Sequence, residues 1–229
     1  MRVPAAAGVL LLALGCGLLA QPLLDVSGAA AGAAGEKGIA ESRSLTESAD
    51  APRAGSRHAG WDPAAAPGTD PSAYGDGIGV LHIPALDGDY RRVIAEGVGL
   101  DVLDRPEVGH FPGTAGPGEV GNFSLAGHRS TALRDVDDLG PGDRIHVQTA
   151  EGFYTYEVRN PHYVVEPTAV DVVAPVPGAP AVAPTERLLT LVTCFGAWND
   201  ADRLIVHAVF VEWRPLWAGP PTDLTLPSR

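Results

Sequence analysis

Cys194 is the only cysteine outside the apolar N-terminal segment, and its surroundings suggest chemistry. It ends an apolar run at 187–194, RLLTLVTC, and the polar loop FGAWNDAD follows it. Arg203 begins the next apolar run, so antiparallel pairing of the two runs would place its guanidinium close to the thiol. A lone cysteine at a strand end is most often an inert buried residue. The alternative is a nucleophile with a cation beside it.

A nucleophilic cysteine also needs a proton acceptor or a cation, because a free thiol is only a few per cent thiolate at neutral pH. Two of the seven histidines are the best candidates for the base. His128 follows the strand-like run NFSLAG, and Gly127 before it would allow a close backbone approach. His207 has the same strand parity as Arg203 and should point to the same face. Spacing favours His128 and leaves His207 as the alternative.

Three segments resemble signatures of the sortase family. TLVTC at 190–194 resembles its TLxTC motif, and AGHR at 126–129 resembles its catalytic-histidine segment. RLIV at 203–206 resembles the segment that contains its catalytic arginine, and the order of the three also agrees. The stretch GHFPGTAGPGEVGNFSLAGHRS and the YTYEV and PTAVDVVAPVP region are most similar to class E sortases. Phe111 stands where class E sequences commonly have tyrosine.

The resemblance implies a cysteine transpeptidase that cleaves a C-terminal LAxTG or LPxTG sorting signal between Thr and Gly. In that scheme Cys194 forms a thioester with the signal, His128 transfers protons, and Arg203 holds the substrate backbone or the oxyanion. The expected substrate-binding residues are Thr193, Phe111 and Trp198. The implied partners are surface proteins with such signals and a lipid II-type cell-wall amine; no cofactor or metal is expected.

Two other functions remain open from the sequence. The same barrel could serve as a non-catalytic cell-surface binding module, or water could replace the amine and give a hydrolytic cysteine peptidase. The complete histidine, cysteine and arginine set argues against the binding module. Asp104, Asp137 and Asp138 are assigned only turn and cap chemistry.

The elements that would position these residues are short strands with little helix between them. Period-2 alternation is clearest in FYTYEV and RLIVHAVF, and AEGF predicts a tight hairpin. This pattern predicts an all-β, closed barrel of about eight strands with short helical turns near 100–104 and 131–138. The predicted strands cover 78–83, 90–95, 121–127, 143–149, 152–159, 162–166, 187–194 and 203–212.

The remaining chain divides by composition. Residues 3–24 contain no charge and are long enough for a membrane span, so 1–24 is predicted to be an N-terminal anchor, with a cleaved signal peptide as the alternative. Residues 25–77, rich in Ala, Gly, Ser and Pro, predict a disordered extracellular linker. The catalytic barrel is expected at 78–213, followed by a Pro-rich tail at 214–229. The expected location is the cell membrane, single-pass, with the barrel outside.

Charge and cysteine content narrow the possible functions. The formal net charge is −12, so the sequence offers no basic stripe to neutralise nucleic-acid phosphates. Two cysteines without a Cys/His cluster at ligand spacing do not predict a zinc site. These features exclude a nucleic-acid partner and leave the thiol as the main chemical feature.

Overall fold

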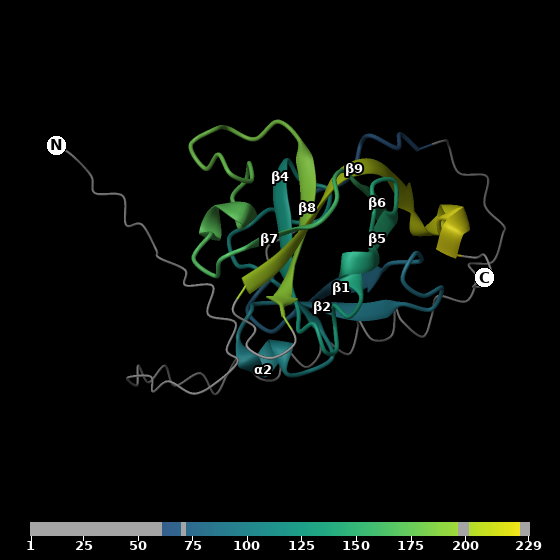
Figure 1. Cartoon of the computed structure of the whole chain (residues 1–229). Coiled ribbons are helices and arrows are strands. Elements are labelled where there is room, and N and C mark those ends of the chain that lie inside the picture. Colours follow the sequence, from purple (N-terminus) through teal and green to yellow (C-terminus); the bar gives the residue numbers. More distant parts are fainter. Residues whose placement is uncertain (1–60, 70–71, 197–201, 225–229) are drawn as a thin grey trace.

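A computed structural model describes residues 61–69, 72–196 and 202–224 (Figure 1). The anchor predicted at 1–24 lies outside these residues. Within the described ranges no helix is long and apolar enough to cross a membrane. The strands are β1 (Gly77–His82), β2 (Arg91–Glu96), β3 (Val108–His110), β4 (Gly121–Ala126), β5 (Arg144–Gln148), β6 (Gly152–Val158), β7 (Tyr163–Val165), β8 (Arg187–Phe195) and β9 (Asp202–Pro215). The short helices are α2 (Leu100–Leu103), η1 (Val136–Asp138), η2 (Val170–Val173), η3 (Leu216–Ala218) and η4 (Thr222–Leu224).

Eight of the strands close into a barrel. The sheet order is β6-β5-β1-β2-β3-β4-β8-β9-β7, and β6 also pairs with β9 to complete the circle. The short strand β7 lies outside this circle, against the first half of β9. The pairings β2–β3 and β4–β8 are parallel and the others are antiparallel, so the barrel is mixed. Closure removes the exposed strand edges that an open sheet would present. The predicted all-β barrel is confirmed.

The strands β4 and β8 are covered on both faces, so nearly every residue along them is buried. One face of each contributes to the barrel core, where Phe123, Leu125, Leu189 and Leu191 pack together. The other face lies under the connection between β7 and β8. There lies a second apolar cluster, which we call the outer apolar cluster. It comprises Leu103, Phe111, Ala126, Val172, Val192, Cys194 and Ile205. The strand alternation therefore directs Cys194 away from the barrel interior.

All eight predicted strands are present, and β3 is the strand that the sequence did not predict. It has three residues, VGH, with a glycine at its centre, so it shows neither length nor alternation. Tertiary pairing defines it: β3 lies between β2 and β4. A Cβ at Gly109 would come within 2.2 Å of the Gly97 carbonyl oxygen, so this close approach requires glycine. The predicted helical turns are confirmed at α2 and, over a shorter range, at η1.

Ordered structure begins before Ile78, in a segment that composition assigned to the linker. The side chain of Trp61 donates a hydrogen bond to the Trp213 carbonyl oxygen at 2.9 Å. The Trp213 amide donates to the Pro63 carbonyl at 2.7 Å, and Arg187 donates to the Ala64 carbonyl at 2.8 Å. Ala66 packs against the barrel core. We call residues 61–69 the N-terminal strap, because they attach to β8 and β9 by these contacts.

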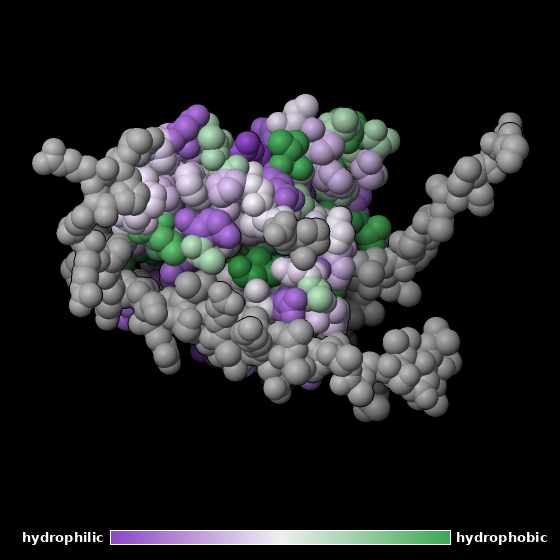
Figure 2. All heavy atoms as spheres, turned by 180° about the vertical axis from the view of Figure 1, so that it is seen from behind, coloured by the Kyte–Doolittle hydropathy of each residue, from purple (hydrophilic) through white to green (hydrophobic). Residues whose placement is uncertain are grey.

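The outer surface shows no bias toward one residue type on the face turned away in Figure 1. Figure 2 shows that hydrophobic residues of the described part form separate patches among hydrophilic residues on this face. Scattered apolar side chains are normal on a folded domain and need no partner.

Candidate active site

Strand register brings Cys194, His128 and Arg203 to the same end of the barrel. Cys194 and Arg203 are direct partners in the antiparallel pair β8–β9. On the other side of β8, Ala126 pairs with Val192 in the parallel pair β4–β8. His128 lies two residues beyond Ala126, as Cys194 lies two beyond Val192. Figure 1 shows β8 running toward the end of the barrel at which α2 lies.

The exit of β4 is held against β8 immediately before His128. The Gly127 amide donates to the Val192 carbonyl at 3.2 Å, and the Thr193 hydroxyl donates to the Gly127 carbonyl at 2.8 Å. A Cβ at Gly127 would lie 2.9 Å from Cγ of Leu133, so the close approach expected from the sequence is present. Thr193 is fully buried, and its hydroxyl positions the histidine segment. Its direct contact with substrate stays a prediction.

The imidazole of His128 has an acidic partner that the sequence did not indicate. Nε2 of His128 lies 3.3 Å from Oδ1 of Asp104, at the end of α2. The Asp104 side chain is 68% exposed and that of His128 is 18% exposed. Asp104 was assigned only cap chemistry, because it is one of 28 acidic residues and lies far from His128 in sequence. This contact leaves Nδ1 of His128 available for proton transfer.

Cys194 lies deeper than a strand-end position suggests. Its relative exposure is 2%, and it belongs to the outer apolar cluster with Phe111 and Val172. Its partner Arg203 is also buried, at 4% exposure, and one guanidinium nitrogen donates to the Asp202 carbonyl at 3.0 Å. Residues directly opposite on paired strands have Cβ atoms about 4.5–5.5 Å apart. The thiol is therefore both buried, as the inert interpretation expects, and adjacent to a cation, as the nucleophilic one expects.

The alternative histidine, His207, lies away from the thiol. It pairs with Thr190, four positions before Cys194, which corresponds to about 13 Å along the strand. Its two ring nitrogens are engaged by Thr190 and Tyr163, each at 2.8 Å. Burial, with a smaller contribution from Arg159, lowers the pKa of His207 from 6.5 to about 4. The geometry therefore favours His128 as the proton-transfer residue.

Trp198, predicted to bind substrate, lies outside the described residues. A cavity of about 630 Å³ is lined by parts of β1, of the β3–β4 connection and of the β5–β6 hairpin. None of Cys194, His128 and Arg203 lines it, because the β5–β6 hairpin meets the end of β9, whereas Cys194 and Arg203 pair at its beginning.

Comparison with known proteins identifies the family. The model of the sortase domain matches residues 81–211. The chain belongs to the sortase family. Sortase SrtE1 of Streptomyces coelicolor is 39% identical to this sortase over 159 residues, which are 66% of the chain and 45% of the relative. Sortase D of Bacillus subtilis is 34% identical over 84 residues, 37% of the chain and 41% of the relative. The chain thus spans less than half the length of these curated relatives.

Solved structures give the same assignment over nearly their whole length. The SrtA sortase from Actinomyces oris has a TM-score of 0.66 and 40% identity, covering 69% of this sortase and 93% of that chain. Sortase E1 from Streptomyces coelicolor, solved with a tripeptide in its active site, has a TM-score of 0.59 and 38% identity, covering 65% and 96%. The similarity to the Streptomyces coelicolor sortase E1 confirms the resemblance to class E sortases.

Proposed function

We propose that this sortase is a class E-type cysteine transpeptidase that uses Cys194, His128 and Arg203. The observation that supports it best is that the strand register places these three residues at the same end of the barrel. Arg203 is the strand partner of Cys194, and His128 follows β4, the parallel neighbour of β8, two residues after the Ala126–Val192 pair. A nucleophile, a proton carrier and a cation are the groups that acyl transfer to and from a thiol requires.

In the first half of the reaction, the thiol of Cys194 has passed its proton to His128, and the thiolate Sγ attacks the carbonyl carbon of the threonine in a sorting signal. The C–S bond forms as the carbonyl π electrons move to oxygen, and Arg203 stabilises this oxyanion with its fixed donors. The tetrahedral intermediate collapses, the Thr–Gly bond breaks, and the imidazolium of His128 gives its proton to the departing glycine amine. The product is a thioester between Cys194 and the surface protein.

In the second half, an amine of a cell-wall precursor attacks the thioester. His128, now neutral, takes a proton from this amine, and the new amide forms as the thiolate of Cys194 leaves. Because Asp104 contacts Nε2, Nδ1 is the nitrogen that we assign to both proton transfers. Water in place of the amine would give hydrolysis by the same groups.

The signal residues before the scissile bond are proposed to contact the outer apolar cluster. Phe111 lies there with Cys194 and is 1% exposed. We propose LAxTG and LPxTG signals as substrates. The phenyl ring of Phe111 has no hydroxyl to offer where class E sequences commonly have tyrosine, so packing alone would set its part in the choice between Ala and Pro.

The test is incubation with LAxTG and LPxTG peptides and an amine acceptor, with the products identified by mass. We expect a peptide–amine adduct and a thioester on Cys194, both absent in Cys194→Ala. We also expect no turnover in His128→Ala. A hydrolysed peptide without adduct would identify a peptidase instead. Cys194→Ala that retains turnover would refute the nucleophile, and a wild-type protein inert toward all peptides would support the binding module.

We propose in addition that residues 1–24 anchor this sortase in the membrane and that the barrel works on the outer side. The apolar stretch 3–24 supports this proposal. Cell fractionation followed by protease treatment of intact protoplasts tests it. We expect the protein in the membrane fraction and the barrel accessible to protease; a protected barrel or a fully released protein would contradict the proposal.

A further inference from the structure

A chain of polar side chains crosses the outer face of four strands, from the exposed Tyr163 to the buried Thr190 and Asn122. It runs from Tyr163 on β7 through His207 on β9 and Thr190 on β8 to Asn122 on β4. The Tyr163 hydroxyl lies 2.8 Å from Nε2 of His207. Nδ1 of His207 lies 2.8 Å from Oγ1 of Thr190, and this hydroxyl donates to Oδ1 of Asn122 at 2.7 Å. We call these four residues the polar relay.

Each hydrogen bond in the polar relay has one direction. Thr190 uses its single hydrogen toward Asn122, so it accepts from His207, whose Nδ1 must bear the proton. The neutral ring then accepts at Nε2 from the Tyr163 hydroxyl. The lowered pKa of His207, about 4, agrees with a neutral ring at physiological pH. With Oδ1 of Asn122 occupied, the amide nitrogen is directed the other way.

The amide nitrogen of Asn122 holds the connection between β7 and β8. It donates to the Val172 carbonyl at 3.3 Å and to the Ala174 carbonyl at 3.1 Å. The hydroxyl of Ser124, two residues along β4 and on the same face, lies 3.5 Å from both the Val173 and the Asn122 carbonyl oxygens. Asn122 thus bonds two carbonyls at the end of η2 to β4. Because Asn122 is 1% exposed, water does not replace these bonds.

The held segment lies beside the nucleophile. Val172 is 4% exposed and packs in the outer apolar cluster with Cys194, Val192 and Ile205. A peptide whose threonine carbonyl reaches Cys194 places its preceding residues within about 3–10 Å of the thiol, at ~3.3 Å per extended residue. Its apolar side chains must therefore meet this cluster, in which Val172 and Phe111 lie outside the strands and α2.

We infer that Asn122, oriented by Thr190, His207 and Tyr163, is a positioning residue that fixes residues 172–174 as a wall for the sorting signal. This role rests on the proposed function, because it acts on the same substrate. The relay touches neither the thiol nor His128, so it should affect how the signal binds and which signal is preferred, and it should leave the reactivity of the thiol unchanged.

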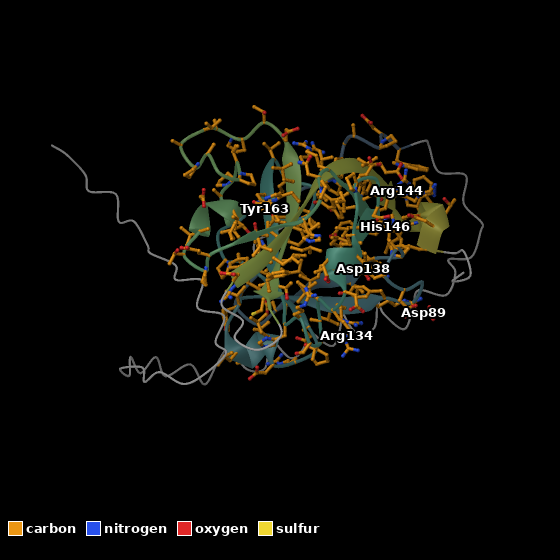
Figure 3. The ribbon with its side chains drawn as sticks, viewed as in Figure 1. Asp89, Arg134, Asp138, Arg144, His146 and Tyr163 are labelled. Atoms are coloured by element: carbon orange, nitrogen blue, oxygen red, sulfur yellow. The ribbon has the colours of Figure 1, made fainter. Side chains whose placement is uncertain are left out.

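The chain contains a matched control for this relay. On the other side of the barrel, His146 of β5 lies 3.0 Å from the hydroxyl of Thr155 on β6, and both side chains are buried. Figure 3 shows His146 well separated from Tyr163. Thr155→Val and Thr190→Val each remove one threonine–histidine hydrogen bond, and Thr190→Val also removes the bond to Asn122 and so interrupts the relay. Loss of the threonine–histidine bond alone would affect both variants alike.

Peptide kinetics with LAxTG and LPxTG signals are the first readout. In Thr190→Val we expect KM to rise about 5- to 10-fold with kcat within about twofold, and the preference between the two signals to change. Thr190→Ser, which keeps the hydroxyl, should restore wild-type values, and Thr155→Val should leave KM and preference unchanged. Alkylation of Cys194 by iodoacetamide should proceed at the wild-type rate in all three. Tyr163→Phe, at the half-exposed end of the relay, gives the same test with a smaller KM effect if Thr190→Val fails to fold.

Hydrogen exchange separates this inference from the proposed function. The Ala174 and Gly178 amides both donate to the Asp171 carbonyl at 3.1 Å, so their exchange reports on the held segment. We expect faster exchange there in Thr190→Val and Tyr163→Phe than in Thr155→Val, whether or not peptides are turned over. Unchanged exchange would overturn the inference that Asn122 and the relay hold residues 172–174 in place. Faster exchange with unchanged KM and preference would overturn the role in signal binding, and a wild-type protein inert toward both peptides would overturn the proposed function and that role together.

Discussion

Cys194 and Arg203 are direct partners across β8 and β9, and both are almost completely buried. A buried guanidinium beside a thiol could act by its charge alone or by aligning the signal and its oxyanion. Lysine could take over the first role but not the second, because arginine presents a planar fork of donors and lysine a single compact charge.

We expect Arg203→Lys to reduce kcat/KM at least about 100-fold, the effect of losing one preorganised oxyanion donor. The pH dependence of Cys194 alkylation should change little, since either cation favours the thiolate. Steady-state peptide assays and a pH series of alkylation rates measure the two quantities. Near-normal turnover in this variant would leave a charge effect as the only role of Arg203.

The contact between Asp104 and His128 predicts a smaller effect. Asp104→Asn should lower kcat about 2- to 5-fold with KM unchanged, because an exposed ion pair contributes roughly 0.2–1 kcal/mol. Asp101→Asn is the matched control, since Asp101 lies on the same α2 and accepts a hydrogen bond from Tyr74 instead. Equal losses in both variants would show a general effect on α2 and would exclude a specific role for Asp104.

The N-terminal strap predicts where a fragment of full stability must begin. A fragment that starts at residue 72 loses the hydrogen bonds of Trp61, Pro63 and Ala64 with β8 and β9. We expect its free energy of unfolding to fall by about 2 kcal/mol relative to a fragment that starts at residue 60. Urea denaturation measures this difference. Both fragments should turn over peptides equally at low temperature. Equal free energies of unfolding would show that residues 61–69 do not stabilise the barrel and belong to the linker.

Two histidines, the buried His82 and the half-buried His207, predict that acid destabilises the barrel. Burial is the main cause that lowers the pKa of both His82 and His207 from 6.5 to about 4. The unfolded chain therefore binds more protons between about pH 6.5 and pH 4, so stability falls as the pH is lowered through this window. Between pH 7 and pH 4.5 each histidine should account for about 2 kcal/mol.

His82→Gln tests this pH dependence, because glutamine can still donate to Oε1 of Gln148, the partner of His82 at 3.0 Å. We expect a shallower loss of stability between pH 7 and pH 4.5 than in the wild type, measured by urea unfolding at several pH values. Parallel stability curves for the two proteins would contradict the assignment of the proton uptake to His82.

The strands were predictable where local pattern and burial agree. FYTYEV and RLIVHAVF alternate because each has one face in the barrel, and the turn AEGF follows from hairpin chemistry. β3 was not predictable, because its three residues are a strand only through their neighbours β2 and β4. The strap was also missed: its composition resembles a linker, and its order comes from contacts with residues far away in sequence.

The sequence by itself determined the chemistry that is available: one cysteine outside the apolar N-terminus, the segments around His128 and Arg203, and the family that they indicate. Only the tertiary structure decided what surrounds these groups. His128 lies at the same end of the barrel as Cys194 because β4 pairs in parallel with β8. The paired residues of these two strands are more than 60 positions apart in the sequence. Asp104 and the polar relay likewise depend on side chains that meet only after the barrel has closed, and residue spacing contains no information on such contacts.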